Sequence, residues 1–171
     1  YKKFRGDLES IGFVVNPYDA CVANRMVDGK QQTVTWHVDD VKASHVDAKV
    51  NDKFVEWLDE KYGDPIIGKV KAVSGKRHDY LAMVLDYSVP GKLKVDMTRY
   101  VKGMVEDFPE PVASVSCPWN DKLLTVDPHS PLLSKNKAEQ FHTSVAKGLF
   151  VSKRARQDVQ PAIAYLTTRV K

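Results

Sequence analysis

Long hydrophobic runs are absent from this sequence of 171 residues. A membrane-spanning helix needs roughly 18 consecutive apolar residues, so this absence excludes one. The first twenty residues also lack the basic, apolar and small-residue order of a signal peptide. Hydrophobic residues nevertheless make up 43% of the chain, which is enough to build one sizeable core. We therefore expect a globular, soluble, intracellular protein with no membrane partner.

Cysteine is scarce. Cys21 and Cys117 stand far apart, and neither belongs to a Cys-x-x-Cys or Cys/His spacing. This pattern excludes a disulfide framework and a zinc site, so we expect two ordinary thiols. Internal repeats and low-complexity tracts are absent as well.

No charge of one sign dominates, since 26 Lys and Arg residues stand against 22 Asp and Glu residues, for a formal net charge of +4. This balance permits contact with a polyanion but does not require it. The basic residues gather in two segments, 69–77 and 147–156, which on charge alone are either solvated surface or phosphate contacts. Gly68 and Gly75-Lys76 do not form a phosphate-binding loop, because six residues separate the glycines where four are required.

Hydrophobic periodicity and turn signals predict an α+β chain. Helices are expected over residues 1–11, 47–62, 98–108, 135–152 and 158–170. Strands are expected at 21–27 and 33–38 around Asp28-Gly29, at 41–44, and at 80–87 and 93–97 around Pro90-Gly91. Residues 65–76 read as a basic loop or an irregular strand region, and residues 112–134 as a turn-rich linker.

Two adjacent carboxylates, Asp39 and Asp40, follow a segment whose alternation of Val34, Trp36 and Val38 predicts a buried strand. Asp is depleted in strands and costly to bury unpaired, so we expect a hairpin tip with both carboxylates exposed. Such a pair is an exposed turn without function, an acid–base pair, or a ligand for a hard divalent cation. A phosphohydrolase built on His37 and the pair is less favoured, because the other histidines are scattered.

A series of short motifs surrounds the pair: Gly12-Phe13, Asn16-Pro17-Tyr18-Asp19-Ala20-Cys21, His37-Val38-Asp39-Asp40, Tyr62-Gly63-Asp64 and His78-Asp79-Tyr80-Leu81-Ala82-Met83. In this order and spacing, the chain resembles the reverse transcriptase of copia-type LTR retrotransposons. Further on, residues 141–150 and Arg156-Gln157-Asp158 resemble the segment between polymerase and RNase H in those polyproteins. The resemblance covers nearly the whole chain.

The resemblance implies part of a polymerase palm over residues 1–111, an antiparallel sheet with packed helices. A linker over 112–134 and a helical connection toward RNase H over 135–171 would follow. The implied activity is that of an RNA-directed DNA polymerase, a nucleotidyltransferase. The chain starts at Tyr1 rather than Met, so we expect a piece of a longer polyprotein. The family's other essential Asp and its nucleotide-binding segment lie on earlier strands, and neither precedes Tyr1. We therefore expect an incomplete site that is inactive alone.

The same resemblance assigns roles residue by residue. Asp39 and its less critical neighbour Asp40 would be the catalytic residues and metal ligands, as part of a site for two Mg²⁺ ions or for Mn²⁺ in their place. His37, where the family has Tyr, and Val38 would lie against the primer end. Leu81, Ala82 and Met83 would match the primer-positioning hairpin, with Ala82 replacing the usual Gly. By position Lys76 is a candidate general acid, and the alternative is a solvated loop lysine.

The implied partners are an RNA template with its DNA primer, deoxynucleoside triphosphates, and the rest of the polyprotein, including integrase and RNase H. The implied location is cytoplasmic particles, with the nucleus as a second compartment. An alternative from another class is a non-catalytic nucleic-acid-binding remnant of a transposon. An upstream Asp-bearing strand encoded in frame would distinguish the enzyme from the remnant.

Overall fold

The computed structural model describes residues 2–120 and 122–170. Tyr1, Asp121 and Lys171, which belong to the predicted segments 1–111, 112–134 and 135–171, lie outside the described residues. The chain divides between Gly75 and Lys76 into two compact units, which we call the N-terminal unit and the C-terminal unit. Each unit contains antiparallel strands and helices, so the predicted α+β class is confirmed. In the described part of the chain, no helix is long and apolar enough to cross a membrane.

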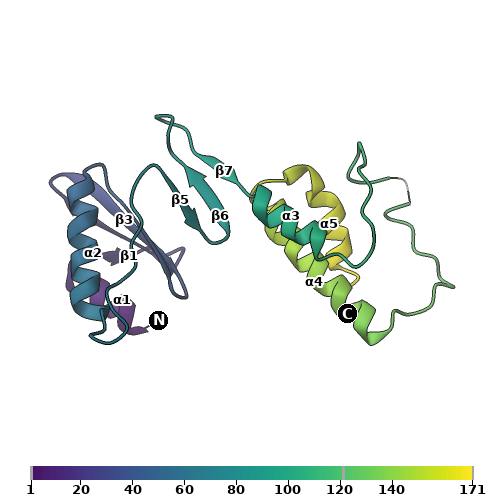
Figure 1. Cartoon of the computed structure of the whole chain (residues 1–171), viewed down its shortest axis with the longest axis horizontal. Helices are drawn as coiled ribbons and strands as arrows, with labels where there is room; N and C mark the ends of the chain where they lie inside the picture. Colours follow the sequence, from purple (N-terminus) through teal and green to yellow (C-terminus); the bar gives the residue numbers. More distant parts are fainter. Residues whose placement is uncertain (1, 121, 171) are drawn as a thin grey trace. The chain divides into compact units, whose positions relative to one another are not determined.

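The N-terminal unit is a four-stranded antiparallel sheet with two helices on one face (Figure 1). Its elements in chain order are α1 (Lys2–Ser10), β1 (Val14–Val15), β2 (Val22–Val27), β3 (Lys30–His37), β4 (Asp40–Ser44) and α2 (Ala48–Tyr62), and the strand order is β1-β2-β3-β4. Side chains from both helices and from alternate strand positions form one core: Leu8, Phe13, Ala23, Val34, Trp36, Phe54 and Leu58. The opposite face of the sheet is not covered by either helix.

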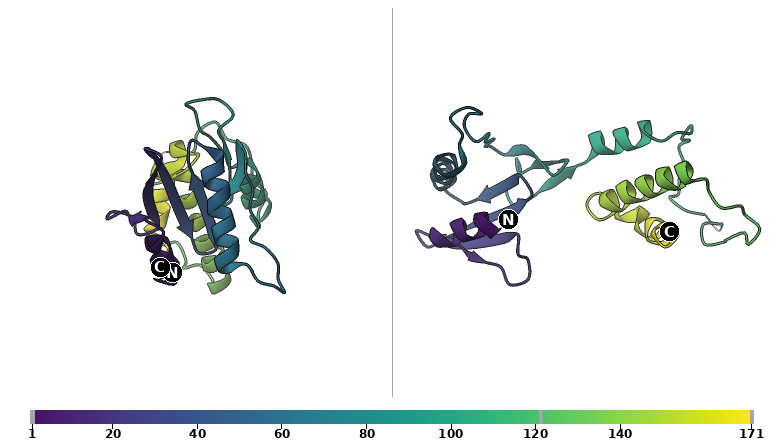
Figure 2. Two further views of the ribbon diagram at one scale, coloured as in Figure 1. Left: turned by 90° about the vertical axis from the view of Figure 1, so that its left-hand side faces the viewer. Right: turned by 90° about the horizontal axis from the view of Figure 1, so that it is seen from below.

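Local signals explain α2, which lies along the strands in Figure 2. Asp47 caps its start, because a side-chain oxygen of Asp47 accepts a hydrogen bond from the backbone N–H of Lys49 at 3.0 Å. Val50, Phe54 and Leu58 recur every four residues and are buried against the sheet. The helix ends at Tyr62, before Gly63, as predicted.

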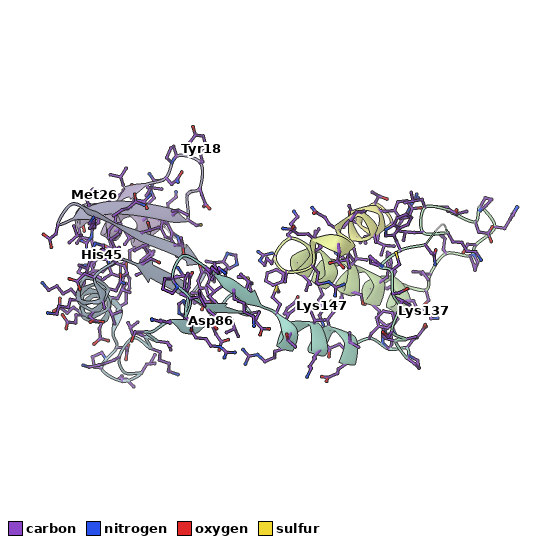
Figure 3. All side chains as sticks on the ribbon, turned by 90° about the horizontal axis from the view of Figure 1, so that it is seen from above. Tyr18, Met26, His45, Asp86, Lys137 and Lys147 are labelled. Carbon is purple, nitrogen blue, oxygen red and sulfur yellow. The ribbon has the colours of Figure 1, made fainter. Side chains whose placement is uncertain are left out.

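The first hairpin of this sheet has a two-residue turn, Asp28-Gly29, with φ of 49° and 71°. Positive φ at both positions is the type I′ geometry that Asp-Gly favours. The prediction of a hairpin here is confirmed. β3 begins three residues earlier than predicted, because the tight turn places Lys30 directly opposite Val27. Met26 lies on this hairpin (Figure 3) and is largely exposed.

The C-terminal unit begins with a three-stranded antiparallel sheet, β5 (Arg77–Tyr80), β6 (Met83–Asp86) and β7 (Lys94–Asp96). The predicted pairing around Pro90-Gly91 is confirmed, since Leu85 lies opposite Val95. The prediction of one continuous strand over 80–87 is wrong. Leu81 and Ala82 form a tight turn with φ of 48° and 59°, and this turn separates β6 from β5. Neither residue favours positive φ, so the sequence carries no turn signal there.

Three helices and one 3₁₀ turn complete this unit: α3 (Thr98–Glu106), α4 (Lys135–Ser152), η1 (Gln157–Val159) and α5 (Gln160–Thr167). The predicted helix 135–152 is confirmed, and the described residues of 112–134 contain no helix or strand. α5 is shorter than the predicted 158–170. The hydroxyls of Thr167 and Thr168 donate to the carbonyls of Ala164 and Tyr165 at 2.7 Å, and such bonds compete with further helix.

Candidate functional site

The Asp pair lies at the end of the β3–β4 hairpin, as predicted. β3 ends at His37, Val38 and Asp39 form the turn, and Asp40 is the first residue of β4, opposite His37 in the register. We call residues 37–40 the Asp hairpin tip. All four residues are exposed, so neither carboxylate bears the cost of burial that made the pair unusual in a strand pattern.

The backbone of this tip is strained at Val38, which has φ of +53°. The first position of such a two-residue turn favours Gly, and a β-branched residue with positive φ is a genuine outlier. Its side chain is 83% exposed, so packing does not offset the strain. A backbone outlier of this kind costs on the order of 1–3 kcal/mol, and such outliers cluster at functional sites.

An aromatic cluster around the buried Trp36 supports the base of the tip. Trp36 precedes the tip and is only 4% exposed. Its ring meets Phe4 of α1 edge-on with centroids 5.4 Å apart, and Phe4 also contacts Tyr62 at the end of α2 at 5.9 Å. The Tyr62 hydroxyl donates to the Asp7 carboxylate. Both helices therefore fix the strand end from which the tip projects.

The tip opens onto the uncovered face of the sheet. Because Trp36 points into the core, the alternation of side chains along a strand places His37 and its register partner Asp40 on the opposite face. Lys42 and Ser44 follow on that face, and the Lys42 ammonium donates to the Ser44 hydroxyl at 2.9 Å. This face is thus polar beside the tip.

The neighbouring strands add both polar and apolar side chains to this face, since the exposed Val14 and Met26 lie opposite Asn24 and Gln31. The Thr33 hydroxyl donates to the side-chain oxygen of Asn24 at 2.7 Å, and the Gln31 amide donates to the same oxygen at 3.0 Å. Around Asn24 this face is hydrogen-bonded and suited to water or a polar ligand.

The two carboxylates fit part of a hard-cation site. Carboxylate oxygens are the ligands that Mg²⁺ prefers, and Mg²⁺ usually keeps several waters or substrate phosphates in its shell. Across residues 2–120 and 122–170, no group of three or more His, Cys, Asp or Glu side chains is arranged to hold a metal ion. Asp39 and Asp40 are therefore a partial ligand set, and a complete two-metal site needs further ligands.

The other residues with predicted roles belong to the C-terminal unit. Leu81 and Ala82 form the β5–β6 turn, and Met83 begins β6. Lys76 is an exposed residue before β5, and its carbonyl accepts from the backbone N–H of Tyr87 at 2.7 Å. The primer-positioning and general-acid roles of these residues stay predictions.

An open groove of about 940 Å³ in the C-terminal unit had no signal in the sequence. It forms where the unexpected strand β5 meets α3, and the Arg99 guanidinium pairs with the Asp79 carboxylate there at 2.7 Å. The six charged side chains that line it balance in sign: Arg77, Arg99, Lys102, Asp79, Asp96 and Glu106. This balance does not favour an anionic ligand over a cationic one.

The two basic segments differ in how far their charges are already engaged. In segment 147–156, Lys147 (Figure 3) pairs with Asp107 at 2.6 Å. Arg156 pairs with both oxygens of Asp158, and this bond raises the pKa of Arg156 and lowers that of Asp158. In segment 69–77, Lys69 is 90% exposed and reaches Asp59 only at 3.9 Å. Segment 69–77 therefore has more charge available to a partner.

Comparisons with protein-family models, with curated proteins and with solved structures find no match to this chain.

Proposed function

We propose that this chain is part of the reverse transcriptase of a copia-type retrotransposon polyprotein, an RNA-directed DNA polymerase. Residues 1–111 would be the later part of the palm, with Asp39 and Asp40 as ligands of the catalytic Mg²⁺. The observation that carries the proposal is the Asp hairpin tip, a strained turn with two exposed carboxylates. It projects from a sheet with helices on one face and with polar side chains beside the tip on the open face.

In this proposal the chain's own residues hold the metal ion and set the direction of its ligands. Asp39 and Asp40 supply negative charge and oxygen ligands, and the strained Val38 fixes the direction in which the tip presents them. When bound, Mg²⁺ activates the primer 3′ oxygen and neutralises phosphate charge. His37 borders the primer end. The RNA template, the DNA primer and deoxynucleoside triphosphates are the substrates, and integrase and RNase H are the polyprotein partners.

The ligand role of the pair can be tested with Mn²⁺, which broadens the NMR signals of nuclei near its binding site. We expect Mn²⁺ to broaden the amide signals of residues 37–41 selectively. Asp39→Asn combined with Asp40→Asn should abolish this effect. Asp28→Asn is the matched control, because Asp28 is a carboxylate in the other tight turn of the same sheet. Broadening that is unaffected by the double variant would contradict the proposal.

We also predict that the chain alone does not extend a primer on an RNA template. Positioning and charge stabilisation provide most of the rate in phosphoryl transfer, and the pair provides only part of the coordination. Primer extension by the purified chain, with Asp39→Asn as control, measures this. Extension that disappears in the variant would show a self-sufficient site and refute the claim that ligands are missing.

A non-catalytic nucleic-acid-binding remnant is the second candidate. The absence of a third metal ligand beside the pair among the described residues is the observation that favours it. A longer sequence read decides between the two, because only the enzyme requires an upstream strand with the further Asp.

A further inference from the structure

The loop after α2 presents adjacent apolar side chains to solvent. Ile66 and Ile67 are 95% and 89% exposed, and Pro65 before them is exposed as well. Single exposed apolar residues are common on protein surfaces. Two neighbouring isoleucines that are almost fully exposed form an apolar patch, which a single exposed residue does not. We call residues 65–67 the loop tip.

Hydrogen bonds hold this loop tip in place. One carboxylate oxygen of Asp64 accepts from the backbone N–H groups of Ile66 and Ile67 at 2.7 and 2.8 Å. These bonds, with Ile67 first, lower the pKa of Asp64 because they favour its charged form. The backbone groups of Asp64 and Gly68 also bond to each other in both directions, at 3.1 and 2.8 Å. The isoleucines are therefore exposed by a formed turn.

The loop is fixed at its far end by Asp59 of α2. A carboxylate oxygen of Asp59 accepts from the backbone N–H of Val70 at 2.7 Å, and the Val70 side chain packs against the core. Because both ends of the segment 64–70 are attached, Ile66 and Ile67 cannot reach the core without breaking these bonds. In the left view of Figure 2, the loop that follows α2 projects away from the helix.

The loop tip lies at the same end of the N-terminal unit as the Asp hairpin tip. Tyr62, the last residue of α2, and Trp36, which precedes His37, both contact the ring of Phe4. The chain needs only three residues from Tyr62 to reach Pro65. Both tips therefore lie at this end of the N-terminal unit, with α2 on the covered face of the sheet and Asp40 on the other face.

We propose that the loop tip is an apolar wedge that enters the minor groove of the primer–template duplex, with Lys69 and Lys71 on neighbouring phosphates. Pro and Ile are among the side chains that insert between base steps in minor-groove complexes. Both lysines are exposed, and Lys contacts phosphates regardless of base sequence. This inference rests on the proposed function, which supplies the duplex.

Other occupants fit the loop less well. Membrane-surface segments depend on Trp, Tyr or Phe beside their basic residues, and residues 63–76 contain none of these. Protein interfaces concentrate their binding energy in Trp, Tyr and Arg, which are likewise missing from this segment.

The wedge can be tested with the full chain and a short RNA–DNA hybrid that carries 2-aminopurine, whose fluorescence rises when it is unstacked. We expect the unaltered chain to bind the hybrid and to increase this fluorescence. The double variant Ile66→Ser/Ile67→Ser should lose the increase and bind at least about tenfold more weakly. Val73→Ser is the matched control, because Val73 is 79% exposed in the same loop but outside the loop tip. It should behave like the unaltered chain.

The outcomes separate the wedge from the function on which it rests. If the isoleucine variant keeps its circular dichroism, its affinity and the fluorescence increase, the wedge is refuted and the proposed function stands. If the unaltered chain does not bind the hybrid, the wedge is refuted, and the proposed function is judged separately by the Mn²⁺ broadening at residues 37–41. Isoleucine-dependent binding to phosphatidylserine vesicles, with no change of 2-aminopurine fluorescence, would assign the loop tip to lipid and overturn the wedge.

Discussion

The two tight turns of the N-terminal sheet differ in how well their residues suit their backbone. Asp28-Gly29 is the pair that a type I′ turn favours. In the Asp hairpin tip, by contrast, β-branched Val38 holds a φ of +53°. Local rules are broken most often at functional sites, and here the broken rule lies beside two adjacent carboxylates. The difference supports the Asp hairpin tip, rather than the Asp28-Gly29 turn, as the site.

The two turns also differ in what lies beneath them. Trp36, at the base of the Asp hairpin tip, is buried against Phe4. Met26, two residues before Asp28, is 66% exposed. The Asp hairpin tip is supported by the core, and the Asp28-Gly29 turn is not. Substitutions at matched positions of the two hairpins therefore test the comparison.

The largest effect is expected from Trp36→Ala. Removing a large buried aromatic side chain leaves a cavity and should lower the free energy of unfolding by about 3–5 kcal/mol. Met26→Ala, the control at the other hairpin, should change it by less than about 0.5 kcal/mol. Urea denaturation followed by circular dichroism measures both. Similar losses of unfolding free energy in the two variants would show that the core does not support the Asp hairpin tip more than the Asp28-Gly29 turn.

The next effect comes from making the relaxed turn strained. Gly29 has φ of +71°, and a Cβ added there meets no atom within 4 Å. The cost of Gly29→Val is therefore backbone strain, and we expect a loss of roughly 1–2 kcal/mol in the free energy of unfolding. Urea denaturation measures this loss. A neutral substitution would show that the turn adapts, and the strain argument for Val38 would fail with it.

The reverse exchange relaxes the strained turn. Val38→Gly should raise the free energy of unfolding by up to about 1 kcal/mol, because glycine adopts positive φ without steric cost. The control is Val46→Gly, at an exposed valine without positive φ, which should lower the free energy by about 0.5–1 kcal/mol. We also expect weaker Mn²⁺ broadening in Val38→Gly, because a flexible turn no longer fixes its carboxylates. If Val38→Gly and Val46→Gly change the free energy of unfolding in the same direction, the claim that Val38 is strained would be contradicted.

The elements that follow local chemistry could be predicted from the sequence. Asp28-Gly29 identifies a hairpin, Asp47 and Gly63 bound α2, and the misfit of Asp39-Asp40 in a strand pattern identifies the Asp hairpin tip. The β5–β6 turn could not be predicted, because Leu81 and Ala82 take positive φ against their preference, and strand pairing imposes that geometry.

Contacts between residues far apart in the chain could not be predicted from the sequence either. The ring contacts that join Phe4 to Trp36 and Tyr62 bring together residues far apart in the chain. The exposure of Ile66 and Ile67 is also contrary to their hydrophobicity. It follows from the carboxylate of Asp64, whose bonds to their N–H groups form only in the folded loop. Periodicity finds which residues are apolar, but not which of them the backbone holds away from the core.

The smallest effect concerns pH, and it sharpens the comparison because Tyr62, which bonds to Asp7, is joined through Phe4 to Trp36 at the base of the Asp hairpin tip. Burial, followed by the Asp7 carboxylate, raises the pKa of Tyr62 from 10.0 to about 12. The folded state thus holds the phenol proton more tightly than the unfolded state. The contribution of this group to stability is fully present below pH 10 and is lost as pH rises toward 12.

Asp7 gives the opposite dependence. The hydrogen bond from Tyr62, and then that from Lys61, lower the pKa of Asp7 below 3.8, so its contribution is present above that pH and is lost as pH falls. Tyr62→Phe should remove the alkaline loss and weaken the acid loss, as measured by the urea midpoint across the pH range. Tyr18→Phe, at a tyrosine that is 97% exposed, should leave the curve unchanged. If the urea midpoints of Tyr62→Phe and of the unaltered chain fall alike between pH 10 and 12, the Tyr62–Asp7 bond does not stabilise the base of the Asp hairpin tip.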